Sequence, residues 1–237
     1  MNIAIIGASG TIGQGFVEHF LKKSKTKSLY LFSRSAINYS DTRIIHHFID
    51  IENEKSIEKA AQIIPDEVTL DYIIVATGVL STDNIMPERS IKELSYDKFN
   101  KVLAINTIGP ALIGKHFIQK LHKDNRSVFA VLSARLGSIS DNNLGGWYSY
   151  RCSKSALNMI IKNMSIEIRY KTPKLIIVGM HPGTVKGKLS DPFSRGISKD
   201  KIFDASYSVS KMIDVITSLT IDDSGKVFAW DGKEIGF

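Results

Sequence analysis

Short apolar runs recur along the chain, and most of them are apolar at nearly every position. A strand that keeps one face in water alternates apolar and polar residues, whereas a strand buried on both faces reads as a continuous apolar run. Strands of the buried kind are therefore predicted at Asn2–Ile6, Ser28–Phe32, Arg43–Ile49, Asp71–Ala76, Ser127–Leu132, Lys174–Met180 and Lys226–Trp230.

Between these runs, apolar residues recur with the spacing of a helix. The predicted helices are Thr11–Lys23, Glu52–Ile64, Tyr96–His122, Gly146–Tyr170 and Ile202–Leu219. This alternation predicts an α/β fold: a doubly wound, mostly parallel sheet of seven strands with right-handed crossovers and helices on both faces. No repeat, low-complexity stretch or linker interrupts the pattern, so we expect residues 1–237 to form a single domain.

One long segment, Lys186–Lys201, follows neither periodicity. It is polar and contains Pro192 and Gly196. Long segments of this kind are exposed, variable between related proteins and often functional. We therefore expect a variable, mobile surface loop that lies over a substrate pocket.

Composition narrows the setting in which the chain works. Hydrophobic residues make up 43% of the 237 residues and charged residues 23%, which is ordinary for a globular protein. The single cysteine, Cys152, excludes an intramolecular disulfide and a thiol-rich metal site, and it fits a reducing compartment. The apolar start Asn2–Ile6 has no basic lead, and no apolar run approaches the length of a membrane span. We expect a cytoplasmic protein with no membrane partner and no bound metal.

The net charge of +7 raises the question of a nucleic-acid partner. The basic residues are spread along the chain, and the densest group follows a predicted helix, where cations complement the helix dipole: Lys22, Lys23, Lys25 and Lys27. No motif interleaves aromatic and basic residues. We therefore expect no nucleic-acid partner, and a basic surface that attracts anionic cofactors.

The first predicted strand runs directly into a glycine-rich turn and then an amphipathic helix. Glycines at such a turn let the backbone approach a pyrophosphate, and the helix N-terminus offers free N–H groups and a positive dipole end. The turn predicts a dinucleotide-binding domain of the Rossmann type, with a phosphate site formed by Gly7, Ser9, Gly10, Thr11, Ile12 and Gly13. The alternative is a plain strand-to-helix turn.

The second predicted strand closes on Ser33 and Arg34, where many NAD-binding folds carry an acidic residue for the ribose hydroxyls. A guanidinium binds phosphate through two parallel hydrogen bonds, so this end favours the 2′-phosphate of NADP over NAD. Asp50 and Ile51 end the third strand, where Asp50 is placed to receive the adenine amino group. Asp50 is equally placed to be the N-cap of the next helix.

Tyr150 and Lys154 lie four residues apart in a predicted helix and therefore share one face. The ammonium of Lys154 favours the phenolate, so we expect the pKa of Tyr150 to fall below its usual value of about 10 and the phenol to exchange protons near neutral pH. Tyr148 is excluded because Cys152 lies four residues on. The alternative is an exposed tyrosine beside a solvated lysine.

Five further segments complete a pattern whose order and spacing are specific: Ala104–Pro110, Leu132–Ile139, Gly146–Leu157, His181–Val185 and Phe228–Ile235. Over essentially its whole length, the chain resembles the short-chain dehydrogenase/reductase family. Within that family it is similar to C-factor-type and carbonyl-reductase-like members.

The resemblance implies hydride transfer between NADP(H) and a small-molecule carbonyl or alcohol substrate, in a homodimer or homotetramer built on the two long helices. It implies that Tyr150 is the acid/base, that Lys154 lowers its pKa and holds the nicotinamide ribose, and that Asn106 holds a water that relays protons. The nicotinamide side of the cofactor site would comprise Gly78, Pro182, Gly183 and Val185.

The chain departs from the family pattern at several positions. Thr11 occupies the place of the usual middle glycine, and Lys186-Gly187-Lys188 replaces the expected Thr or Ser. Before Gly78, the chain has Val75-Ala76-Thr77 where the family usually has Asn-Asn-Ala. The family serine falls on Ala134, so the substrate-orienting hydroxyl is left to Ser133, which we favour, or to Ser138.

These departures keep other functions open. An NADP-binding regulatory or signalling protein with little turnover is consistent with the loss of the family serine. An epimerase or dehydratase acting on nucleotide sugars is suggested by the glycine spacing, but it would need a larger C-terminal substrate region than this chain has room for.

Overall fold

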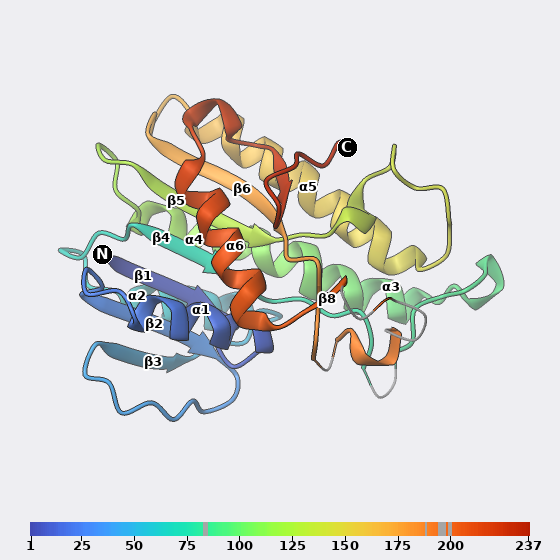
Figure 1. Cartoon of the computed structure of the whole chain (residues 1–237), viewed down its shortest axis with the longest axis horizontal. Helices are drawn as coiled ribbons and strands as arrows, with labels where there is room; N and C mark the ends of the chain where they lie inside the picture. The colour runs from blue at the N-terminus through green and yellow to red at the C-terminus, as the bar shows by residue number, and fades with distance from the viewer. Residues whose placement is uncertain (83–84, 188, 194–197, 199–200) are drawn as a thin grey trace.

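The computed structural model describes residues 1–82, 85–187, 189–193, 198 and 201–237. Its centre is one parallel sheet of seven strands in the order β3-β2-β1-β4-β5-β6-β9 (Figure 1). The strands are β1 Asn2–Ile6, β2 Ser28–Ser33, β3 Ile44–Phe48, β4 Tyr72–Val75, β5 Ser127–Leu132, β6 Leu175–His181 and β9 Val227–Ala229. The predicted single-domain, doubly wound α/β fold is confirmed, and all seven predicted strands are present.

Helices cover both faces of this sheet. The main ones are α1 Thr11–Leu21, α2 Glu54–Gln62, α3 Tyr96–Leu103, α4 Gly109–Phe117, α5 Tyr148–Ile168 and α6 Ala205–Ser218. The buried side chains of α1 and α6 join one apolar core, and those of α2, α4 and α5 join the other. Strand β1 shows the reason: Ile3 and Ile5 face the first core, whereas Ala4 and Ile6 face the second.

The strand order reverses at β1, which lies between β2 and β4. In parallel sheets of this kind, ligands bind beyond the carboxyl ends of the strands at such a reversal point. Here Ile6 pairs with Phe32 on one side and Val75 on the other. The residues that follow these three positions therefore meet at one edge of the sheet.

The predicted helix Tyr96–His122 is one continuous helical run with an irregular middle. Between α3 and α4 lies a π-helical turn, Ala104–Ile108, in which Gly109 N–H bonds the carbonyl of Ala104, and a 3₁₀ turn, Ile118–Lys120, ends the run. Turns of the π type are rare and are frequently found at functional sites. Asn106 is at the centre of this one.

Three predicted helix starts are too early. Helix α5 begins at Tyr148 rather than Gly146, because Trp147 before it has a left-handed backbone with a φ of 51°. Ile202–Phe203 form strand β8, which pairs with β7 at Thr184–Val185, so α6 begins only at Ala205. Helix α2 begins at Glu54, because the side chain of Asn53 accepts the N–H of Ser56 and caps the helix. Asp50 is therefore not the N-cap.

The β7–β8 pair closes the two ends of the predicted loop Lys186–Lys201. Within that loop, residues 188, 194–197 and 199–200 lie outside the described residues. No described helix has the length and apolar composition that a bilayer span requires.

Candidate active site

Tyr150 and Lys154 are both buried in the first two turns of α5, with 8% and 3% of their surfaces exposed. The Tyr150 ring packs against Leu80 and Ala134. The ammonium of Lys154 lies 5.9 Å from the centre of that ring and donates a hydrogen bond of 2.9 Å to the carbonyl of Leu132, the last residue of β5. The predicted pair is thus held together at the carboxyl edge of the sheet.

The predicted effect of Lys154 on the tyrosine is wrong for this arrangement. Burial raises the pKa of Tyr150 to about 12, because the phenolate would lose its hydration. Burial likewise lowers the pKa of Lys154 to about 8. The ammonium bonds Leu132 rather than the phenol, so desolvation outweighs the attraction between the two groups.

Asn106 links three elements of this site. Its Oδ1 accepts the N–H of Val79 at 2.8 Å, and its Nδ2 donates to the carbonyl of Val79 and to the hydroxyl of Ser153. Ser153 in turn donates to the carbonyl of Tyr150 at 2.7 Å. The carboxamide is completely buried, so it ties the segment after β4 to the turn of α5 that carries the tyrosine.

Gly78 lies between Asn106 and Lys154. A Cβ atom at Gly78 would stand 3.6 Å from Asn106 Oδ1 and 3.6 Å from Lys154 Nζ. The glycine therefore leaves the two polar side chains facing the same small space beyond β4.

The glycine-rich turn fits a phosphate group. Gly7 has a φ of 86°, and a Cβ atom at Gly13 would stand 2.1 Å from the carbonyl oxygen of Gly7, so the backbone packs too closely here for any side chain. Helix α1 begins after Gly10, and no described side chain caps it. The first N–H groups of α1 are thus available to an anion.

At the end of β2, the side chain of Arg34 is exposed to solvent and that of Ser33 is not. The Arg34 side chain is 68% exposed and lies 3.9 Å from Glu52. Ser33 is buried, and its hydroxyl donates to the carbonyl of Ser35 and contacts Nε2 of His46 at 3.0 Å. Of the two residues predicted for the ribose phosphate, Arg34 has its polar group toward solvent.

The adenine side of the predicted site is the end of β3. Asp50 Oδ1 accepts the N–H of Glu52 at 3.1 Å, and the Asp50 N–H donates to Ser56. Ile51 is partly buried and packs against the core clusters below. Both residues lie beyond the same sheet edge as Arg34.

The segment after β6 makes a tight turn. Gly183 has a φ of 75°, and a Cβ atom there would stand 2.7 Å from the ring of Phe203. The carbonyl of Pro182 accepts the hydroxyl of Ser208 at 2.6 Å, and Val185 is buried in β7. These contacts fix the turn beside the carboxyl end of β6.

His181, the last residue of β6, precedes this turn. Burial, helped by the charge of Arg135, lowers the pKa of its imidazole to about 4. The ring is therefore neutral at pH 7 and adds no positive charge near Lys154.

The two candidate serines occupy different surroundings. The Ser133 hydroxyl donates to Asn158 Oδ1 at 2.6 Å, directly before Ala134, which packs on Tyr150. The Ser138 hydroxyl contacts that of Ser140 at 3.2 Å and lines a cavity beside the C-terminal residues. The structure thus brings the neighbour of Ser133, rather than Ser138, against the tyrosine.

Sequence reasoning missed Glu88. Its completely buried carboxylate accepts both the N–H and the hydroxyl of Ser149 in the first turn of α5. The backbone carbonyl of Glu88 accepts the N–H of Trp147. A carboxylate is favoured at a helix N-terminus. Because the contact spans 61 residues, no local sequence pattern indicates it.

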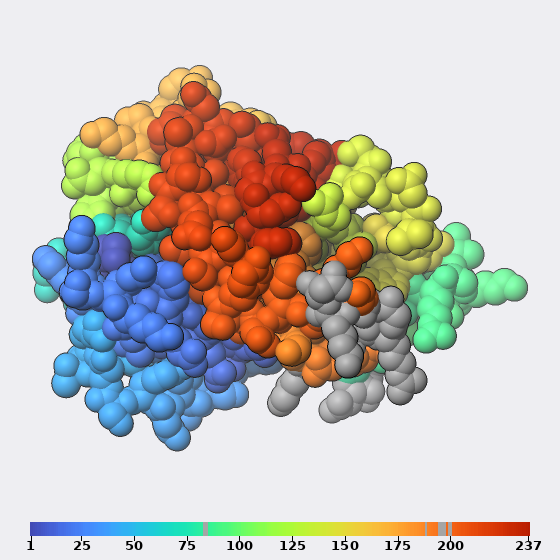
Figure 2. Space-filling view, in the orientation of Figure 1, coloured from blue at the N-terminus to red at the C-terminus, as the bar shows by residue number. Residues whose placement is uncertain are grey.

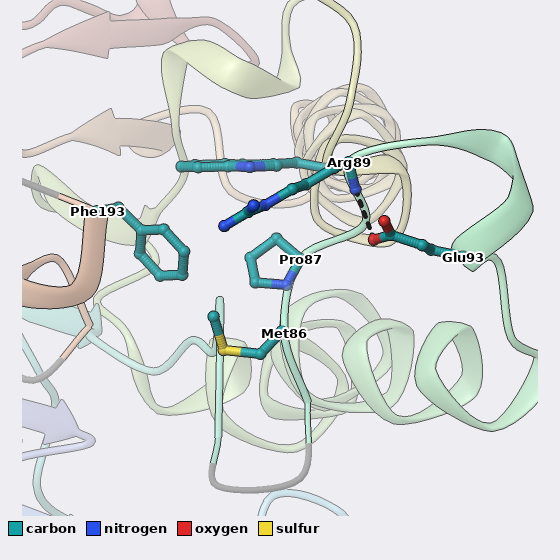
Figure 3. Close-up of a pocket in the computed structure, with 6 residues that line it drawn as sticks. Met86, Pro87, Arg89, Glu93 and Phe193 are labelled. Carbon is teal, nitrogen blue, oxygen red and sulfur yellow. Dashed lines mark hydrogen bonds between the residues drawn. The ribbon is translucent and has the colours of Figure 1, made fainter.

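A cavity of about 470 Å³ lies beside Glu88 and the start of α5. It is lined by Met86, Pro87, Arg89, Glu93, Trp147 and Phe193 (Figure 3). The Trp147 ring contacts the ring of Tyr150 on one side and that of Phe193 on the other, with centres 6.5 Å and 5.1 Å apart. Phe193 belongs to the predicted loop Lys186–Lys201, so the described part of that loop does border a pocket.

Comparison with known proteins gives a family match and similar sequences. Residues 1–197 match the family described as short chain dehydrogenase. The C-signal protein of Myxococcus xanthus is 30% identical over 146 residues, which cover 62% of this chain and 82% of that protein. The 1-hydroxy-2-glutathionyl-2-methyl-3-butene dehydrogenase of Rhodococcus sp. (strain AD45) is 29% identical over 185 residues, which cover 78% of this chain and 76% of that one.

Among solved structures, the NADPH-bound carbonyl reductase from chicken fatty liver has the same fold. It superposes with a TM-score of 0.87 at 24% identity, covering 100% of this chain and 98% of that one.

The buried ammonium makes stability depend on pH. Unfolded Lys154 binds its proton up to about pH 10.5, whereas the folded side chain releases it near pH 8. Raising the pH from 8 to 10 should therefore stabilise the wild type relative to Lys154→Met by about 2–3 kcal/mol. Urea unfolding of both proteins across this range measures the difference. Lys162→Met, at an exposed position on the same helix, is the control: the free energy of unfolding of the wild type relative to this variant should not change with pH. If the wild type relative to Lys154→Met also showed no change between pH 8 and 10, the burial effect would be contradicted.

Proposed function

The chain belongs to the short-chain dehydrogenase family, and from that premise we propose that it transfers a hydride between NADP(H) and a carbonyl or alcohol substrate. The observation that carries this proposal is the buried pair of Tyr150 and Lys154 at the carboxyl edge of the sheet, where the Trp147 ring lies between the Tyr150 ring and a cavity. Substrates of such enzymes bind at this edge.

The proposed cofactor site extends from the glycine-rich turn to the turn after β6. The pyrophosphate would meet the uncapped start of α1, formed by Gly7, Ser9, Gly10, Thr11, Ile12 and Gly13. Arg34, with Ser33 behind it, would bind the 2′-phosphate, and Asp50 and Ile51 would border the adenine. The nicotinamide would lie near Gly78, Pro182, Gly183 and Val185. The bound dinucleotide supplies the hydride.

The chain itself supplies the proton. With its pKa raised to about 12, Tyr150 is a neutral phenol at pH 7 and can donate its Oη proton to a carbonyl oxygen. The ammonium of Lys154, on the same helical face, would stabilise the phenolate that remains. Asn106 would hold the segment after β4 and the tyrosine turn in register while the proton moves. Reduction is the direction we propose.

We propose Ser133 as the hydroxyl that orients the carbonyl, with Ser138 as the alternative. Ser133 follows directly on Leu132, whose carbonyl holds Lys154, and precedes Ala134, which packs on Tyr150. Ser138 borders a different cavity. Contact with a substrate would require the Ser133 hydroxyl to leave or share its bond to Asn158.

One observation supports a second function. At the position where the family carries its serine, Ala134 lies in the same buried cluster as Tyr150 and offers no hydroxyl. An NADP-binding regulatory or signalling protein with little turnover would tolerate this loss, and the likeness to a C-signal protein is in keeping with it. Measuring NADPH oxidation with aldehydes, ketones and quinones separates the two functions.

Replacing Tyr150 by phenylalanine removes the proton donor and keeps the ring. We expect Tyr150→Phe to lower kcat for carbonyl reduction by about 1,000-fold, while the Kd for NADPH stays within about twofold. Tyr148→Phe, two residues earlier on the same helix, should keep activity. If NADPH binding fell together with activity, the tyrosine would have a structural role instead.

The serine assignment is tested by comparing two alanine variants at saturating NADPH. Ser133→Ala should lower kcat by about tenfold to a hundredfold, the usual effect of losing one polar contact to the reacting group. Ser138→Ala should change kcat by less than about threefold. A larger loss in Ser138→Ala would transfer the role to that residue.

The cofactor assignment is tested at Arg34. We expect Arg34→Asp to reduce the ratio of kcat/KM for NADPH to that for NADH by about a hundredfold, because the carboxylate repels the 2′-phosphate and accepts ribose hydroxyls. Lys123→Asp, an equal charge change before β5 at the opposite edge of the sheet, is the control. An unchanged ratio in Arg34→Asp would rule out this phosphate contact.

A further inference from the structure

The cavity that Trp147 links to Tyr150 has four apolar lining residues and two charged ones. Met86, Pro87, Trp147 and Phe193 supply the apolar walls, and the charged residues are Arg89 and Glu93. Cavities that bind small molecules are typically of this kind, with a few polar groups that fix orientation. The charge that a substrate meets here depends on which of these two side chains is not already bonded to another group of the protein.

The carboxylate of Glu93 is already bonded to the backbone. Its Oε2 accepts the backbone N–H of Arg89 at 2.9 Å. Figure 3 shows the carboxylate turned toward the backbone of Arg89, on the side away from Phe193. Glu93 therefore holds the chain in place rather than facing the centre of the cavity.

The guanidinium of Arg89 has no partner among the residues that the structure describes. Its side chain extends away from Glu93 and toward Phe193 (Figure 3). Over the part of the chain that the structure describes, no ion pair or side-chain hydrogen bond involves this guanidinium. The cavity thus presents one unpaired positive charge.

Hydrogen bonds hold the backbone of Arg89 and of the residue before it. Glu88, the preceding residue, is completely buried and bonded to Ser149 and Trp147 at the start of α5. The N–H of Arg89 itself is bonded to Glu93. This segment projects at one end of the molecule, in the teal-green of residues near 90 (Figure 2), and its contacts give the backbone of Arg89 a defined position relative to the start of α5. Such preorganisation lowers the entropic cost of binding.

We infer that the substrate is an apolar, preferably aromatic, carbonyl compound that carries a carboxylate, and that Arg89 is the residue that binds this carboxylate. A guanidinium and a carboxylate form two parallel charge-assisted hydrogen bonds, so even the exposed Arg89 side chain can bind a carboxylate in a defined geometry. The ring of the substrate would pack against the same two aromatic side chains. This inference names the substrate class of the proposed reductase and rests on that function.

Two aldehydes that differ in one charge test the inference. Wild-type protein is assayed with NADPH and either para-formylbenzoate or its neutral methyl ester. We expect kcat/KM for the acid to exceed that for the ester by about tenfold or more, and Arg89→Gln to remove most of this preference. Lys92→Gln removes an equal charge at an exposed neighbour that does not line the cavity, and it should keep the wild-type ratio. A wild-type ratio near one, or a ratio unchanged in Arg89→Gln, overturns the inference.

A binding measurement separates this inference from the proposed function. The corresponding alcohols, para-(hydroxymethyl)benzoate and its methyl ester, are titrated into both proteins, with and without NADP, while tryptophan fluorescence is followed, since Trp147 lines the cavity. Tighter binding of the acid that is lost in Arg89→Gln, without turnover of either aldehyde, would support the carboxylate site and contradict the reductase. Turnover of both aldehydes with equal binding of both alcohols would support the reductase and overturn the role of Arg89.

Discussion

The burial of the Lys154 ammonium is the constraint on which the rest of this site depends. A buried cation is costly unless oxygen atoms surround it. Lys154 finds the carbonyl of Leu132 at the end of β5, and Gly78 after β4 leaves space beside its ammonium. Gly137 packs so closely that a Cβ atom would stand 2.8 Å from the Lys154 backbone. Two strand ends and the turn after β5 are therefore held against one residue of α5.

Much of this arrangement could be predicted from the sequence because it follows from local patterns. The seven apolar runs predicted the seven strands, and a four-residue spacing placed Tyr150 and Lys154 on one helical face. The β7–β8 pair was missed because each strand is only two residues long and its partner lies across the whole loop. Glu88 was missed for the related reason that its partner is Ser149, far along the chain. Nothing in a short window of sequence records such contacts.

The error over the tyrosine pKa has the same origin. Spacing determines which face of α5 the two side chains share, but not how deeply that face is buried or where the ammonium finds its acceptor. In the folded chain the ammonium is bonded to Leu132, and burial dominates the pKa of both groups. A phenol with a raised pKa still serves a reductase, since the step that the chain must supply is donation of a proton to the carbonyl oxygen.

The two sides of the site are built differently, and this has a consequence for specificity. The proposed cofactor side consists largely of backbone: the start of α1, the tight turn at Gly183 and the glycines whose side-chain space is already filled. The cavity side consists of side chains on three segments. Glu88 holds residues 86–93 to the start of α5, where Trp147 lies, and Phe193 belongs to the loop whose two ends the β7–β8 pair joins. Because the Glu88 contacts do not involve the guanidinium of Arg89, that side chain can change without moving Tyr150. A family that keeps one reaction while changing its substrates would gain from this division, since the proton donor stays in place while the cavity wall is altered.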